Sequence, residues 1–283
     1  MLDTKIIKKI SDYVYIKPRT IQEISTLINK NWRTADRYVN EIINQTGNLS
    51  IRTFREGTKG ALKIVYWSNI EKIHSYEFQE KLFNKIERTH RKIDFSPFDI
   101  FQYVDKDKRH AFLEEQIEEG KTAINEDLIG LLRSAKKQVL FFSGNLSWAN
   151  LIQDKEKVID VLEELARKNI LIKMLSSVDI SGIENTQKVM AINEILGKDS
   201  IEIKHAEQPL RAIIIDDKMA RFKEVKNPRD YKKGELKKKT FIFYDIYDKE
   251  WIEWLQKVFW NMFRTAIPAN KRVEDIKTIQ KLK

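Results

Sequence analysis

The stretch of sequence that decides the fold of the N-terminal part, residues 31–42, reads NWRTADRYVNEI. Its apolar residues recur at helical spacing, so that Ala35 and Val39 share one face of a helix, whereas Arg33 and Arg37 lie on the opposite face. The stretch therefore predicts an amphipathic helix that buries one side and presents a polar, basic side to the surroundings.

A second predicted helix lies directly upstream of this one. Thr20 is a good N-cap and Glu23 follows three positions later, which is the spacing of a capping box that opens a helix over residues 21–28. Residues 29–31 then form a short turn, and Asn31 caps the next helix. The order is helix, short turn, helix.

A further helix and a hairpin complete this part. Isoleucines recur at helical spacing between Asp3 and Asp12, and two alternating runs, 49–54 and 61–67, flank the glycine-bounded turn 55–60. This layout resembles the winged helix-turn-helix domains of archaeal and bacterial transcription regulators, and NWRTADRYVNEI resembles their recognition helix. The resemblance covers residues 1–68. It implies binding to double-stranded DNA, with the recognition helix in the major groove and the hairpin on the neighbouring backbone or minor groove.

The candidate DNA-binding residues follow from this layout. Arg33, Thr34 and Arg37 would reach base edges, where an arginine paired with a guanine contributes roughly 1 to 3 kcal/mol of discrimination. The residues expected on phosphates are Lys30, Arg52, Arg55, Lys59 and Lys63. Trp32 and Tyr38 flank the apolar stripe and are expected to pack rather than to stack on bases. In the alternative interpretation, the winged helix is a protein-interaction or architectural module and its arginines are a solvated face.

The positive charge of the chain is gathered in three segments. The 283 residues carry 52 Lys and Arg against 42 Asp and Glu, a net charge of +10. Residues 1–68, 226–239 and 268–283 hold +6, +5 and +3, so the rest is net acidic. This distribution favours a polyanionic partner. A generally lysine-rich surface is the alternative. The stretch 226–239 is expected to be a solvated loop, and 268–283 a mobile basic tail.

Several classes of chemistry are excluded or unsupported. The absence of cysteine rules out disulfides, cysteine-bound metals and a thiol nucleophile. No motif for phosphate loops or dinucleotides is present, so no cofactor is expected. No apolar run is long enough to cross a membrane, and no signal peptide is recognised, so we expect a cytoplasmic protein that binds no membrane. The histidines are scattered without metal-ligand spacing, and no metal is expected: His74, His90, His110 and His205.

Residues 69–120 are predicted to connect two domains. From Ile70 to Ile93 the chain lacks Gly and Pro and carries apolar residues at mixed spacings of three, four and seven, which predicts a long amphipathic linking helix. This helix could form a two-stranded dimer interface or pack on its own chain, and the sequence favours the dimer only slightly. The segment 95–98 ends the helix, and the part that follows it has no assigned structure.

Beyond Gly120 the pattern alternates between helices and short buried strands, which is typical of an α/β layer with a mixed sheet. This order, with SAKKQVLFFSG, ILIKMLSS and PLRAIIIDDKMARF, resembles one half of a phospholipase D-like domain over residues 121–267. Active members carry H-x-K, a later Asp and then G-S-x-x-N, with the histidine as nucleophile. Here Asp216 and Asn227 match, but Pro209 stands at the position of the histidine and Arg211 at that of the lysine. Since proline has no nucleophile, the resemblance implies the fold and argues against catalysis. His205 lies four residues upstream of Pro209 and is expected to be structural.

The same resemblance suggests a site for a small anionic effector. Arginine grips phosphate or carboxylate bidentately, and the candidate residues are Arg211, Asp216, Lys223 and Asn227. Because each site of the superfamily is assembled from two halves, the resemblance also implies a homodimer. The whole arrangement is similar to the TrmB-like archaeal transcription regulators, whose C-terminal part dimerises and senses effectors.

The sequence therefore predicts an α+β protein with a winged helix-turn-helix, a long linking helix and a phospholipase D-like domain. The leading hypothesis for its function is a homodimeric, sequence-selective, non-enzymatic transcription regulator. The competing hypotheses are a phospholipase D-type nuclease or phosphodiesterase targeted by the winged helix, and an architectural or protein-interaction protein.

Overall fold

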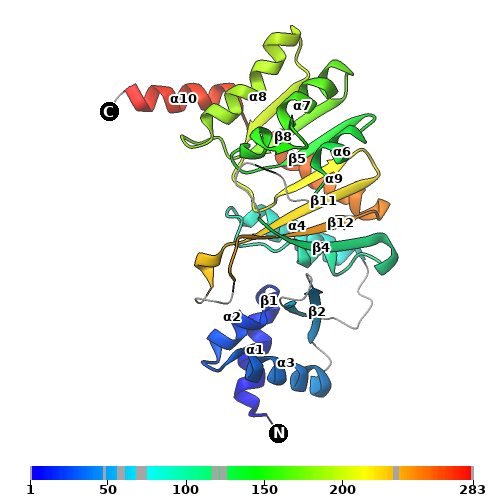
Figure 1. Cartoon of the computed structure of the whole chain (residues 1–283), viewed down its shortest axis with the longest axis vertical. Helices are drawn as coiled ribbons and strands as arrows, with labels where there is room; N and C mark the ends of the chain where they lie inside the picture. Colours follow the sequence, from blue (N-terminus) through cyan, green and yellow to red (C-terminus); the bar gives the residue numbers. More distant parts are fainter. Residues whose placement is uncertain are drawn as a thin grey trace.

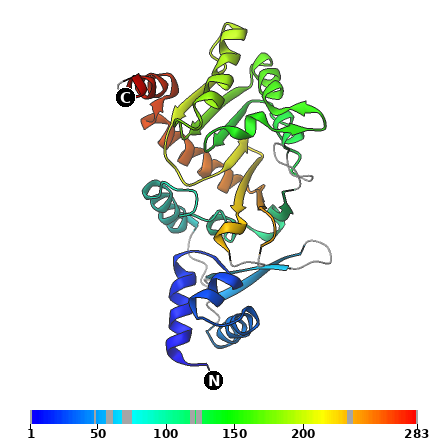
Figure 2. The same ribbon diagram turned by 60° about the vertical axis from the view of Figure 1, so that its left-hand side comes forward.

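The structure, a computed structural model, has a helical N-terminal unit at one end of an elongated molecule and a large sheet in the remainder (Figures 1 and 2). We call the second part, the described residues from 75 to 281, the body. The structure describes residues 2–46, 49–55, 61–67, 75–116, 121, 126–231 and 236–281.

The N-terminal unit has the winged helix-turn-helix layout. The capping box between Thr20 and Glu23 is present, and Asn31 accepts a 2.9 Å hydrogen bond from the backbone N–H of Thr34, as predicted. The wing strands pair in the order β1-β3-β2, and their inner face closes a small core with the helices. The elements are α1 (Thr4–Ile16), β1 (Arg19–Thr20), α2 (Ile21–Leu27), α3 (Trp32–Thr46), β2 (Leu49–Arg55) and β3 (Ala61–Trp67).

The linking segment differs from the prediction. Within the described residues the helix α4 spans only Ser75–Arg88, and its Leu82 and Ile86 are buried in the core of the same chain. The chain continues through α5 (Phe98–Phe101) to β4 (Arg109–Glu115), which pairs with the last long strand of the body. The segment is thus part of the body, and the described part of the linking helix packs on its own chain instead of offering a free dimer interface.

The body contains a mixed eight-stranded sheet, as predicted, in the order β13-β9-β8-β5-β10-β11-β12-β4. Strands β5, β8 and β9 are parallel to one another, and the others pair antiparallel. The strands are β5 (Gln138–Phe142), β8 (Leu171–Ser176), β9 (Ile201–His205), β10 (Ala212–Ile215), β11 (Met219–Lys226), β12 (Thr240–Ile246) and β13 (Ile267–Pro268).

Helices cover both faces of this sheet. One hydrophobic core lies under α4, α5 and α9 (Lys249–Thr265), and the other under α6 (Leu128–Arg133), α7 (Val158–Arg167) and α8 (Ile183–Leu196). The predicted basic tail is instead the helix α10 (Ala269–Lys281), which adds buried residues to the second core. The predicted basic tail is therefore packed against the body, and the buried residues on its inner face stabilise the body.

The winged helix and the body share one core. The outer face of the wing sheet places Phe54 and Ile64 in the same cluster as Tyr244 of β12. The rings of Tyr66 and Phe98 lie 4.6 Å apart, which joins β3 to the start of α5. Burial of apolar surface between the two parts fixes the winged helix against the body.

Candidate nucleic-acid interface and anion cavity

The recognition helix α3 presents two arginines to solvent. Arg33 and Arg37 are both exposed, and neither forms an ion pair with any residue that the structure describes. Thr34 is half-buried between them, and Lys30 is exposed in the turn before the helix. Two unpaired guanidinium groups one helical turn apart on an exposed helix are suited to phosphate or base-edge contacts.

Lys63 of the wing is tied to the same helix. Its ammonium group contacts both carboxylate oxygens of Asp36, at 2.7 and 2.8 Å. The pair holds β3 against α3, and it neutralises the charge that the sequence assigns to a phosphate contact.

Of the other wing residues predicted to contact phosphates, the structure describes the side chain of Arg52 only. Arg52 faces the body, with its guanidinium carbon 5.3 Å from the centre of the Phe101 ring and 5.5 Å from that of Phe54. Arg52 lies on the outer face of the wing sheet, so it is not grouped with the candidate DNA-binding residues of α3. Lys59 lies outside the described residues, and the structure describes the backbone of Arg55 but not its side chain.

Trp32 is a residue that the sequence analysis placed wrongly. Its side chain is 50% exposed at the start of α3, and it belongs to none of the described core clusters. The guanidinium of Arg33 lies 5.7 Å from its ring centre. Tyr38, in contrast, packs against the core as predicted. An indole beside Arg33 enlarges the surface that α3 can offer to a partner.

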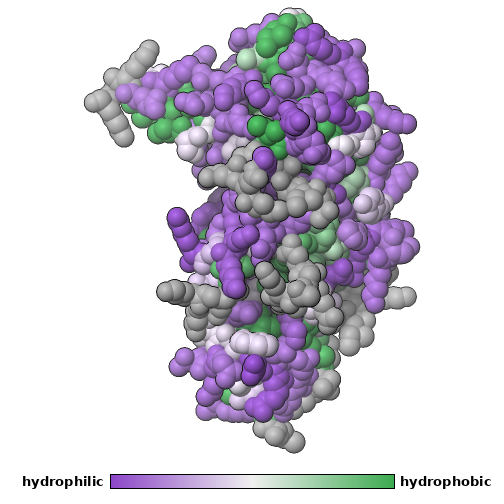
Figure 3. All heavy atoms as spheres, viewed as in Figure 1, coloured by the Kyte–Doolittle hydropathy of each residue, from purple (hydrophilic) through white to green (hydrophobic). Residues whose placement is uncertain are grey.

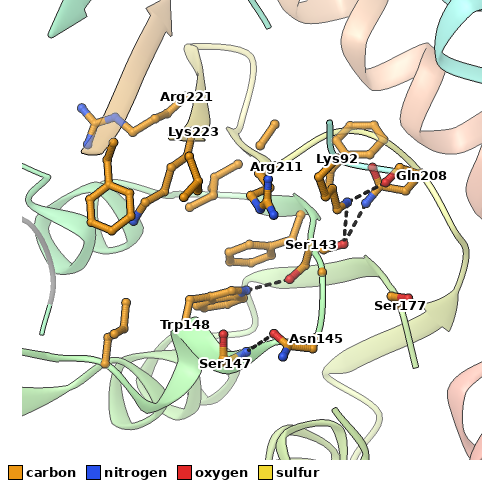
Figure 4. Close-up of a pocket in the computed structure, with 18 of the residues that line it drawn as sticks. Lys92, Ser143, Asn145, Ser147, Trp148, Ser177, Gln208, Arg211, Arg221 and Lys223 are labelled. Carbon is orange, nitrogen blue, oxygen red and sulfur yellow. Dashed lines mark hydrogen bonds between the residues drawn. The ribbon is translucent and has the colours of Figure 1, made fainter. Parts of the chain in front are cut away.

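A second candidate site lies in the body, in a cavity of about 600 Å³. It opens where the parallel strands β5 and β8 end, next to Ser143 and Ser177, and it is bounded on the other side by β10 and β11. Figure 4 shows Arg211 between Lys223 and Lys92, with Trp148 and Ser147 across from them. The carboxyl ends of parallel strands are a common place for ligands in α/β sheets.

Lys92, which the sequence analysis missed, enters the cavity from the segment after α4. Its ammonium group donates hydrogen bonds to the carbonyl oxygens of Ser143 at 3.1 Å and of Gln208 at 2.6 Å (Figure 4). It donates a third, also of 2.6 Å, to the carbonyl oxygen of Leu210. Burial and the nearby charge of Arg211 hold the pKa of Lys92 well below its usual range. No carboxylate within the described residues forms an ion pair with it.

Arg211 stands directly before β10 and lines the same cavity. Its guanidinium group has no hydrogen-bond or ion-pair partner among the residues that the structure describes. Burial lowers the pKa of Arg211, and the negative charge of Glu224 acts in the opposite direction. Glu224 is itself bound to Lys226 at 3.0 Å and to the hydroxyl of Tyr244 at 3.0 Å.

The other cations of the cavity differ from Arg211 because they have partners. Lys223 contacts Glu126 at 2.9 Å, and Arg221 forms a two-pronged contact with Asp245 at 2.7 Å. Asn227 also lines the cavity. Arg211, Lys223 and Asn227, three of the predicted effector residues, are therefore brought together.

Asp216 is not part of this group. It follows β10, whereas Arg211 precedes it, and five residues of extended strand span roughly 17 Å. Its buried carboxylate accepts hydrogen bonds from the backbone N–H groups of Lys136, Lys137 and Gln138, at 2.8 to 2.9 Å. These bonds keep the pKa of Asp216 low although burial acts to raise it. The motif match thus marks a structural residue.

The histidines do not rebuild the missing nucleophile at position 209. Pro209 is buried, and His205 is not among the residues that line the cavity. The ring nitrogen Nδ1 of His205 accepts a 3.0 Å hydrogen bond from the backbone N–H of Val178. Burial, together with the charge of Arg272, lowers the pKa of His205. The histidine that lines the cavity is His90, which is exposed at its rim.

A metal-binding cluster and a membrane-spanning helix are both absent from the described residues. Among them, no three His, Asp or Glu side chains are grouped so that they could hold a metal ion. No helix in the described part of the chain combines the length and the apolar character that a membrane crossing requires.

Comparisons with known proteins return only structural similarity. No protein-family model matches the chain, and no curated protein matches it. A phospholipase D family member, Nuc from Salmonella typhimurium, has 9% identity and a TM-score of 0.40, over 57% of this chain and 98% of that chain. TrmBL2, an archaeal chromatin protein, has 11% identity and a TM-score of 0.39, over 94% of this chain and 93% of that chain. NucT from Helicobacter pylori has 12% identity and a TM-score of 0.39, over 57% and 99%.

The architecture of this chain, a winged helix on a mixed-sheet α+β body, is the one that the sequence resemblance implied. At TM-scores of 0.40 or lower, the similar structures carry no further argument about this chain.

Proposed function

We propose that this protein is a DNA-binding transcription regulator that reads double-stranded DNA with α3 and carries a non-catalytic effector domain. The observation that carries the proposal is the pair Arg33 and Arg37, exposed and without acidic partners in the described part of the chain. The Asn31 cap fixes the start of the helix that presents them. Because α3 packs through Ala35 and Val39, the arginines face outward.

The test is an electrophoretic shift assay combined with selection of bound sequences from a random pool. We expect one enriched sequence motif, and we expect affinity to fall steeply as salt rises, because phosphate contacts release counterions. The double variant Arg33→Gln/Arg37→Gln should lose the motif preference. The matched control is Lys5→Gln, an exposed cation on α1. Binding without any sequence preference would instead favour an architectural role, and no binding at about 50 mM salt would contradict the proposal.

The proposed regulator acts as a homodimer, because a two-fold reader matches a palindromic site. Isoleucines lie exposed on and around the outer helices of the body, and hydrophobic surface is visible over α8 and α10 in Figure 3. These residues are a candidate contact surface: Ile180, Ile195, Ile267 and Ile279. Light scattering on the purified chain measures the oligomeric state directly, and a monomer at micromolar concentration would contradict this part of the proposal.

The nuclease alternative now has a different candidate residue. His90 lies at the rim of the cavity that holds Arg211, whereas His205 lies outside its lining. We propose that the body does not hydrolyse phosphodiesters, because Pro209 cannot form a covalent intermediate. Incubation with plasmid DNA and with a chromogenic phosphodiester tests this. Cleavage that disappears in His90→Ala would establish the enzyme alternative.

A further inference from the structure

The cavity of the body contains two cationic groups whose charge no acidic side chain in the described structure compensates by direct contact. Arg211 has no ion-pair partner there, and Lys92 is held only by carbonyl oxygens. A buried cation without a counter-ion is costly, because transfer from water to a low-dielectric interior disfavours the charged form. A ligand that brought negative charge to this position would remove that cost.

Positively charged side chains also predominate in the lining of the cavity. Among the described lining residues are seven Lys and Arg side chains and three Asp and Glu side chains. Of the acidic ones, Glu126 is engaged with Lys223, and Asp179 accepts hydrogen bonds from Ser181 and Gly182. The cavity therefore has an excess of positive charge, which favours anions.

The positions of Arg211 and Lys92 also indicate how compact the negative charge of the bound anion must be. Arg211 and Lys92 both line the cavity and lie next to each other in Figure 4, so both charges act on one place. A phosphate monoester carries about −1.5 to −2 charges on one tetrahedral group at neutral pH. A dicarboxylate spreads the same charge over two separated groups. All three ammonium protons of Lys92 are already donated to carbonyls, so Arg211 supplies the direct contact and Lys92 supplies field.

The size of the cavity indicates more than a free phosphate ion. A volume of about 600 Å³ lies within the usual range of sites for organic ligands, about 300 to 1,000 Å³. The Trp148 ring, which stacks on Phe141 at 4.6 Å and donates a 2.8 Å hydrogen bond to the hydroxyl of Ser143, forms a rigid apolar side. The hydroxyls of Ser147 and Ser177 provide polar contacts nearby.

We propose that this cavity binds an organic phosphate monoester, with Arg211 gripping the phosphate and Lys92 completing the positive site. The inference rests on the proposed effector role of the body and names the chemistry of the effector. It does not depend on whether the winged helix binds DNA.

Isothermal titration calorimetry on the full chain tests the proposal with inorganic phosphate, AMP, glucose 6-phosphate and succinate. We expect both organic monoesters or one of them to bind at least about tenfold more tightly than succinate, and more tightly than inorganic phosphate. Arg211→Gln should weaken that binding by about tenfold or more. The matched control is Arg167→Gln, which removes an equal charge from the exposed face of α7.

Arg211→Gln should retain the fold, because the guanidinium makes no hydrogen bond that the fold depends on, and a thermal melt checks this. No binding of any phosphate probe at millimolar concentration, binding of succinate as tight as that of the monoesters, or wild-type monoester affinity in Arg211→Gln would each overturn the proposal. A loss of DNA affinity in ligand-free Arg211→Gln would also overturn it, because the cavity would then serve DNA phosphates. A shift assay on the same preparations separates this inference from the DNA-binding proposal.

Discussion

The ammonium group of Lys17 donates a 2.9 Å hydrogen bond to the carbonyl oxygen of Ile93. Lys17 directly follows α1 of the winged helix, and Ile93 directly follows the cavity residue Lys92. A ligand whose charge acts on Lys92 therefore acts on a segment that is bonded to the DNA-reading part of the chain.

Lys17→Met should weaken the coupling between the cavity and the winged helix. If the proposed ligand and DNA both bind, a saturating phosphate monoester should change the DNA affinity of the wild-type chain by about fivefold or more, the lower end of common coupling energies. In Lys17→Met the phosphate monoester should change the DNA affinity little or not at all. Fluorescence anisotropy with labelled DNA, with and without the monoester, measures it. An unchanged ligand effect would show that the coupling takes another route.

Phe54→Ala should separate the unfolding of the winged helix from that of the body. Phe54 is 6% exposed and meets the ring of Tyr244 edge-on at 6.4 Å. Removing a buried phenylalanine costs about 3 to 5 kcal/mol. We expect one calorimetric transition in the wild type and two in the variant, the earlier from the winged helix. The control is Ile16→Ala at a position of α1 that is 63% exposed, which should leave the wild-type profile.

Lys63→Gln should affect DNA affinity less than Arg37→Gln. Asp36 already neutralises Lys63 at 2.7 Å, whereas Arg37 is exposed and has no acidic partner in the described structure. We expect less than about 1 kcal/mol for Lys63 and about 1 to 3 kcal/mol for Arg37 if it reads a base. Anisotropy titrations at fixed salt compare the two. The reverse order would mean that the ion pair opens when DNA binds.

Glu23→Gln should reduce stability at neutral pH but not in acid. Burial acts to raise the pKa of Glu23. The charge of Lys226, the hydrogen bonds from Thr20 and the charge of Arg19 together lower that pKa by more than burial raises it, so the net pKa is below its usual value. Its ionised form therefore adds stability above the unfolded pKa of about 4.3, and this contribution is lost as pH falls through the lower folded pKa. Glutamine can keep the capping box.

Urea unfolding at about pH 7 and at about pH 3 measures the difference between wild type and Glu23→Gln. The difference should be present at the higher pH and should shrink at the lower one. A difference that is the same at both values would place the effect in the cap rather than in the charge.

Asp216→Asn should destabilise the body without touching the phosphate site. The carboxylate accepts bonds from three backbone N–H groups, and leaving such groups unsatisfied costs about 1 to 3 kcal/mol. Asparagine tolerates the left-handed backbone at this position, where φ is 50°. Urea denaturation measures the loss, and calorimetry with AMP should give the wild-type affinity. Weaker AMP binding at unchanged stability would mean that Asp216 takes part in binding the ligand.

The local signals in the sequence predicted most of the elements. Strand β9 (Ile201–His205) and helix α9 (Lys249–Thr265) belong to the alternation of helices and short buried strands expected beyond Gly120, because apolar periodicity acts over neighbouring residues. The capping box of α2 is of the same kind. Strand β4 was missed, since its pairing with β12 depends on residues more than a hundred positions away.

The anion site was predictable only in part, for the same reason. Arg211 and Lys223 came from a spacing pattern along one stretch of chain, and Asp216 was assigned wrongly because that pattern takes no account of the length of an extended strand. Lys92 has no local signal at all. Its role arises because its segment crosses the loop 208–210, which is more than a hundred residues away.

The shared core between the wing sheet and the body also bears on how two copies would meet an operator. Since Phe54 and Ile64 lock the winged helix to the body, the described structure has no free hinge on which α3 could swing. In a dimer, the spacing and rotational phase of the two half-sites would be set by the contact between bodies. Inserting about five base pairs between half-sites, half a turn of the duplex, would then turn one α3 away from its groove.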